Sequence, residues 1–111
     1  MAKTKAQLAK RALQKIFVVS GTEEPKAEDA QLVSDIWTSV RAELIAQRVA
    51  GLSDNSIPDD GFEAVADYLA QCIAPDFGIP ADQDAKKMAL GRVFMALGTG
   101  YTGQVLRTDF F

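Results

Sequence analysis

Histidine is absent from this chain of 111 residues, and cysteine occurs once, as Cys72. Without histidine the chain lacks the side chain that most often acts as acid or base near neutral pH and most often binds metals. Serine–histidine and cysteine–histidine catalysis are thereby excluded. A single cysteine cannot form a disulfide within the chain or a cysteine cluster around a metal, and it favours a reducing compartment. We therefore expect no metal, no cofactor and no catalytic residue.

Long apolar runs are also missing. The run that follows the basic start, residues 16–19, is far shorter than the roughly 20 residues needed to span a bilayer, and no other run comes close to that length. The basic start of the chain is not followed by the apolar stretch of a signal peptide. We expect no membrane partner and a protein that assembles in the cytoplasm.

Neither sign of charge dominates: 12 basic and 15 acidic residues give a net charge of −3, which disfavours a generic nucleic-acid binder. The distribution is uneven, because the first 15 residues carry five bases and no acid, whereas residues 22–63 carry mostly acids. The five bases are Lys3, Lys5, Lys10, Arg11 and Lys15. Three interpretations stay open. These bases contact an acidic face of a neighbouring copy, they line a DNA channel, or they form an ordinary solvated helix face.

Apolar residues recur at spacings of three and four along four segments, which predicts four helices and no strand. The first spans about residues 4–19, because Thr4 and Gln7 form a capping-box pattern and Ser20-Gly21 provides a stop. The second spans about residues 25–50, with Pro25 in its first turn, Val49 in its apolar stripe and Gly51 as its stop.

The third predicted helix spans about residues 59–74 and ends because Pro75 disfavours helical angles in the residue before it. Cys72 lies on its apolar face, so we interpret it as a small core residue. The fourth spans about residues 80–98, with Asp82 in its first turn and with Met88 and Met95 among its apolar positions. The fold class is therefore all-α: a four-helix domain over residues 1–98, followed by an extended tail over residues 99–111.

The last thirteen residues combine glycines with large apolar side chains near the terminus. Such a segment either folds back onto its own domain or orders on a partner. The residues that would contact a partner are Val105, Leu106, Arg107, Phe110 and Phe111.

Three further patterns are only weak indications of a binding or catalytic site. Residues 98–103 have the spacing G-x-G-x-x-G, but they follow a predicted helix, whereas the dinucleotide motif follows a strand. The carboxylate pairs Glu23/Glu24 and Asp59/Asp60 lie on polar turns and are typical of helix caps. Residues 54–60 lack the central glycine and the closing glutamate of a calcium-binding loop.

Three stretches resemble the head-completion adaptors of short-tailed phages, also called tail accessory or packaged-DNA stabilisation proteins. These are the basic start over residues 3–15, the Glu23-Glu24-Pro25 turn before a long helix carrying Trp37, and the run Leu-Ala-Gln-Cys-Ile-Ala-Pro-Asp-Phe over residues 69–77. A final Ala/Lys-rich helix like residues 84–90 follows in the family. The match covers about residues 2–95, and the family's C-terminal extension is longer than the thirteen residues found here.

This resemblance implies a structural subunit of the virion. Such adaptors form a ring, generally of twelve copies, beneath the portal ring, where they extend the DNA channel, close the filled head and carry the tail. The implied partners are the portal ring, tail, nozzle or tail-fibre proteins and neighbouring copies, with packaged DNA in non-specific proximity. The C-terminal tail of such subunits commonly reaches the portal.

Two other functions stay open. A small helical DNA-binding or regulatory module would need a basic recognition helix in a short helix-turn-helix, and the only strongly basic helix is the first. A cell-wall hydrolase associated with the virion would need a desolvated carboxylic acid, for which the sequence gives no sign.

Overall fold

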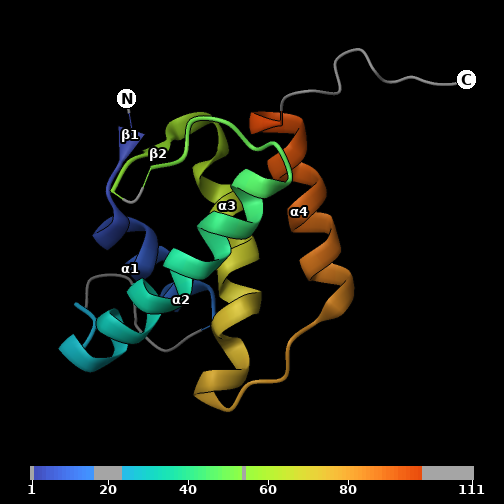
Figure 1. The fold of residues 1–111 in the computed structure, drawn as a ribbon. Coiled ribbons are helices and arrows are strands. Elements are labelled where there is room, and N and C mark those ends of the chain that lie inside the picture. Colours follow the sequence, from blue (N-terminus) through green and yellow to red (C-terminus); the bar gives the residue numbers. More distant parts are fainter. Residues whose placement is uncertain (1, 17–23, 54, 99–111) are drawn as a thin grey trace, which may run out of the picture.

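In the computed structural model, the described residues are 2–16, 24–53 and 55–98, and they form four helices and one short pair of strands (Figure 1). The helices are α1 (Lys5–Lys15), α2 (Ala27–Ala46), α3 (Asp59–Ile73) and α4 (Gln83–Leu97). A 3-10 turn, η1 (Ala74–Phe77), follows α3. The strands β1 (Ala2–Lys3) and β2 (Ile57–Pro58) pair in antiparallel fashion. The predicted all-α fold class is confirmed.

The centre of the bundle is α3, which packs most extensively against α4 and next against α1 (Figure 1). The largest side chains that are completely buried come from all four helices and from β2: Trp37, Leu8, Leu13, Leu44, Ile57, Leu69, Ile73, Val33, Val65 and Val93. Among the described residues no polar or charged side chain is buried. The core is therefore held by the hydrophobic effect, with about 1.5–3 kcal/mol for each large side chain removed from water.

The start of α1 follows the predicted capping box. The Thr4 hydroxyl accepts a hydrogen bond from the Gln7 backbone N–H at 3.2 Å, and the Thr4 N–H donates to Gln7 Oε1 at 2.8 Å. These two bonds satisfy backbone donors that a helix start leaves without partners. The helix ends at Lys15, and the predicted stop at residues 20–21 lies outside the described residues.

The second helix is shorter than predicted at both ends. Pro25 was expected in its first turn but precedes the N-cap residue, Lys26. The C-terminal end lies four residues before the expected position, because Arg48 adopts a left-handed conformation with φ of 69°. The Arg48 N–H donates to Ile45 O and the Val49 N–H donates to Leu44 O, which is the Schellman pattern with arginine in the usual place of glycine. Val49 therefore leaves the helix and pairs with Gly98 in an isolated β-bridge.

The boundaries of α3 agree with the prediction, but Pro75 does not end the helical path. It lies at the start of η1, and Gly78, with φ of 75°, then reverses the chain. Helix α4 begins at Gln83, three residues later than expected, because the Asp82 side chain caps it by accepting a hydrogen bond from the Ala85 N–H at 3.1 Å. Cys72 is half-buried and packs against the core, as its position on the apolar face of the helix indicates.

Two predictions about side chains and strands are wrong. The strand pair β1–β2 was not expected, since two residues are too short to show an alternating pattern. Met88 and Met95 were expected to face the core, but they are 69% and 89% exposed. Ala89 and Val93 take the buried positions of α4 instead.

Candidate interaction surfaces

The predicted partner-binding residues Val105, Leu106, Arg107, Phe110 and Phe111 lie outside the described residues, as does the whole tail over residues 99–111. Their contact with a partner stays a prediction. The surfaces that the structure does describe are the basic helix α1, the groove beside it and the exposed side of α4.

The bases at the start of the chain are held against acidic residues of the same chain. Lys3 lies 3.9 Å from an Asp59 carboxylate oxygen, and its ammonium group lies 5.6 Å from the centroid of the Phe62 ring. Lys10 Nζ donates to Glu24 Oε1 at 2.9 Å. At the start of α1, the backbone N–H of Lys5 donates to Asn55 Oδ1 at 2.9 Å, which ties this helix to the loop before β2.

A ladder of ion pairs joins α1, α3 and α4. Arg11 Nε lies 3.1 Å from Glu63 Oε2, and Lys15 Nζ lies 2.9 Å from Glu63 Oε1. Lys15 also reaches Asp67 Oδ1 at 2.7 Å, and Arg92 of α4 reaches Asp67 Oδ2 at 2.9 Å. We refer to these five side chains as the charge ladder. It places two carboxylates of α3 between two bases of α1 and one of α4.

The charge ladder changes the interpretation of the basic start. We expected these bases to match a neighbouring copy, to face DNA or to be solvated, and we did not expect acids of the same chain. Ion pairs within the chain are formed by Lys3, Lys10, Arg11 and Lys15. Their charge is therefore partly neutralised before any partner binds.

The ladder also shifts the ionisation of Glu63. The hydrogen bond from Arg11 lowers the pKa of Glu63, the Lys15 interaction lowers this pKa further, and partial burial opposes both. A carboxyl group with a lowered pKa stabilises the fold above its unfolded pKa, and this stability is lost as the pH falls through the folded pKa. Because the side chain is 53% exposed, water screens much of this effect.

We therefore predict that Glu63→Gln lowers the free energy of unfolding by about 0.5–1 kcal/mol at pH 7 and by nothing measurable at about pH 3. Urea unfolding at both pH values, followed by circular dichroism, measures the difference. Glu43→Gln is the matched control, because Glu43 is exposed and lies near the C-terminal end of α2, where a negative charge gains nothing from the helix dipole. Equal losses at both pH values would contradict an electrostatic origin.

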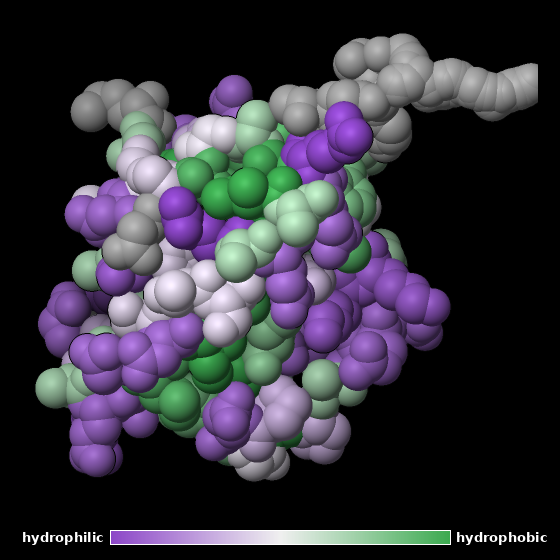
Figure 2. Space-filling view, viewed as in Figure 1, coloured by the Kyte–Doolittle hydropathy of each residue, from purple (hydrophilic) through white to green (hydrophobic). Residues whose placement is uncertain are grey.

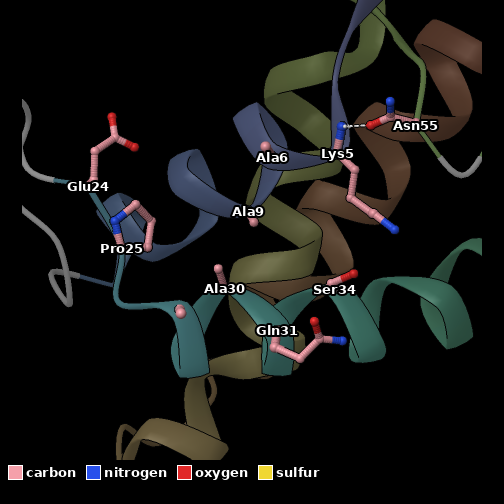
Figure 3. A pocket seen from close by; sticks show the side chains of 10 residues that line it. Lys5, Ala6, Ala9, Glu24, Pro25, Ala30, Gln31, Ser34 and Asn55 are labelled. Atoms are coloured by element: carbon pink, nitrogen blue, oxygen red, sulfur yellow. Dashed lines mark hydrogen bonds between the residues drawn. The ribbon is translucent and has the colours of Figure 1, made fainter.

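A groove of about 470 Å³ runs between α1 and α2 (Figure 3). Its walls are small and apolar: Ala6, Ala9, Ala27 and Ala30. Glu24 and Pro25 lie at one end, and Lys5 and Asn55 lie at the other (Figure 3). Ser34 and Gln31 add polar groups along α2, so the groove offers an apolar floor with a polar rim.

The described residues offer few reactive side chains. Burial raises the pKa of the Cys72 thiol, which makes it a poor nucleophile at neutral pH. Burial also raises the pKa of the neighbouring Tyr68. Residues 2–16, 24–53 and 55–98 contain no group of three or more cysteines or acids placed to hold a metal ion. No helix among these residues is long and apolar enough to cross a membrane.

The fold and these surfaces define a small all-α domain that presents charged and apolar faces to its surroundings (Figure 2). No family model, no curated protein and no solved structure matches the chain.

Proposed function

We propose that the chain is a structural subunit of the head-to-tail connector of a tailed phage. Copies of it form a ring beneath the portal, extend the DNA channel, close the DNA-filled head and provide the platform to which the tail attaches. It works in the virion, as a binding component and not as an enzyme.

The observation that carries this proposal is the structural role of residues 69–77, the stretch with the sharpest resemblance to phage adaptors. It forms the end of α3 and the whole of η1. Ala74 is buried, Phe77 packs against the core, and the Ile79 N–H donates to Ala74 O at 3.0 Å. The run therefore forms the corner that lays α4 against α3, so the resemblance involves residues that determine the architecture.

The physical demands of the role agree with the chain. The DNA in a filled head exerts pressure on the portal opening, so the ring that closes this opening needs a large total interface. In a closed symmetric ring, the modest contact made by each copy is repeated by every other copy. The four helices and β2 completely bury ten large side chains among themselves, so this core forms from residues 8–93. This supports assigning Val105, Leu106, Phe110 and Phe111 to contact with the portal.

The alternatives fit less well. Lys3, Lys10, Arg11 and Lys15 already pair with carboxylates of the same chain, which weakens the case for a DNA-binding module. For a hydrolase, the side chain of Glu24 is 79% exposed and paired with Lys10, so it is not a desolvated acid. Glu23 lies outside the described residues.

The decisive experiment mixes the purified chain with a matching purified portal ring. We expect the chain to sediment as a monomer by itself and to co-sediment with the portal, with about twelve copies visible as a ring in electron micrographs. If the portal does not bind the chain at any salt concentration, the proposal fails.

A further inference from the structure

The C-terminal end of α4 is tied to a distant part of the chain. In Figure 1, the segment that follows α2 passes beside the last turn of α4. The Ala50 N–H donates to Leu97 O at 2.9 Å, and Gly98 pairs with Val49 in an antiparallel bridge. The Gly98 N–H also donates to Phe94 O at 2.8 Å. The last described residues before the tail therefore contact both their own helix and the segment after α2.

This segment is itself anchored in the domain. The side chains of Val49 and Leu52 are only 4% and 8% exposed, so both belong to the core. Between them, Gly51 has a φ of 82°, and a Cβ atom added there would lie 3.0 Å from Pro58 Cγ. The hydrogen bond from Ala50 therefore ties the end of α4 to a part of the chain that is packed against β2 and the core.

Two glycines allow the end of α4 to lie this close to its neighbours. In the first turn of α3, a Cβ atom added to Gly61 would come within 2.5 Å of Leu97 Cδ1. A Cβ atom added to Gly98 would overlap the carbonyl oxygen of Phe94. Gly91 provides the contrast, because a Cβ atom added there would meet nothing within 4 Å. Glycine is thus required on steric grounds at the end of α4 and at the part of α3 that contacts it.

We propose that Val49, Ala50, Gly61, Leu97 and Gly98 form an exit clamp, which fixes the place and the direction in which the tail over residues 99–111 leaves the domain. A tail with a fixed start loses less conformational freedom on binding than a tail whose first residues rotate freely. Where the domain and the tail both make contacts in an assembly, a fixed start also raises the effective concentration of the tail at its site. That this site lies on the portal rests on the proposed function; the clamp itself does not.

Distances between two spin labels test the exit clamp in the full chain without a partner. In a Cys72→Ala background, one label is attached at Thr99→Cys, the first residue of the tail. The other is attached at Asp76→Cys, which is exposed on η1 and follows the end of α3 opposite to Gly61. Double electron–electron resonance measures the distribution of distances between the two labels.

We expect Gly61→Ala and Gly98→Ala to broaden this distribution or to move its maximum, because the added methyl group displaces Leu97 or the backbone at residue 98. Gly91→Ala is the matched control: the same methyl group meets no atom there and should leave the distribution unchanged. If Gly61→Ala and Gly98→Ala both give the distribution of the labelled parent chain, the proposal is overturned.

Ile73→Val separates the exit clamp from a general loss of stability. Ile73 is completely buried at the end of α3 opposite to Gly61, so removing one methylene group there should lower the thermal midpoint without changing the label distances. A change in the distribution as large as that caused by Gly61→Ala would show that the distances follow stability alone, and it would also overturn the proposal.

Portal binding by the unlabelled variants measures what the exit clamp contributes to the partner contact. Gly98→Ala should weaken binding about fivefold or more, because one more backbone residue must be ordered, whereas Gly91→Ala should bind like the wild type. If residues 99–111 are needed for portal binding but Gly98→Ala binds as tightly as the wild type, the clamp does not position the tail and the proposal is overturned. If the wild type itself does not bind the portal, the connector role is rejected, and the label distances alone decide whether the clamp exists.

Discussion

Deletion of residues 99–111 is expected to abolish portal binding while leaving the helical domain folded. The last helix ends at Leu97, and the large buried side chains lie between residues 8 and 93, so the deletion removes no described helix and none of this core. It does remove the apolar side chains at positions 105, 106, 110 and 111. Co-sedimentation with the portal ring measures binding, and far-ultraviolet circular dichroism measures helix content.

A pair of matched variants separates the role of the aromatic end from that of chain length. Phe110→Ala with Phe111→Ala should weaken portal binding by about a hundredfold or more, because each buried phenylalanine contributes about 1.5–3 kcal/mol. Thr102→Ala with Gln104→Ala, in the same segment, should change binding little. A truncated chain that binds the portal as tightly as the full chain shows that another surface makes the contact.

The positions of helix ends were predictable where a local capping pattern coincided with the start of an apolar face that is buried in the core. Thr4 and Gln7 form the expected capping box, and α3 begins at Asp59 as predicted. The end of α2 was not predictable from glycine, since Gly51 comes after the true turn. Arg48 adopts the left-handed angle there because Val49 and Leu44 both bury their side chains, and this tertiary gain outweighs a cost of about 1–2 kcal/mol for a residue with a Cβ atom.

The charge ladder has a counterpart in the spacing of charged residues in the sequence. Arg11 and Lys15 are four residues apart, and so are Glu63 and Asp67, so each pair lies on one face of its helix. Joining the two pairs requires the knowledge that α1 packs against α3, which periodicity within a single helix does not contain. Pairing between helices is a property of tertiary packing.

The face of α4 that is buried could not be predicted from the sequence, for a related reason. Apolar residues occur around most of this helix, so two different faces satisfied the helical period. Ala89 and Val93 are small enough to let α4 approach α3 closely, and with them inside, Met88 and Met95 turn outward. Packing against α3, and not the helical period, therefore determines which face of α4 is buried.

Replacement of Trp37 by alanine is expected to bring the domain close to unfolding. Trp37 is the largest completely buried side chain, and its helix α2 packs against both α1 and α3. Removing a buried tryptophan side chain costs about 3–5 kcal/mol, because transfer free energy is lost and a cavity remains. A domain of this size has only about 5–15 kcal/mol of total stability. Urea unfolding, followed by circular dichroism, measures the loss.

Met95→Ala is the matched control, since it also truncates a large apolar side chain but at a position that is 89% exposed. Its cost to the isolated chain should stay within about 0.5 kcal/mol, as is usual for surface substitutions. The contrast between the two variants tests which helix faces form the core: Trp37 is buried among the helices, whereas Met95 lies on the exposed face of α4. Similar losses for both would mean that α4 is packed against its own chain at Met95, and the assignment of Ala89 and Val93 to its buried face would then be wrong.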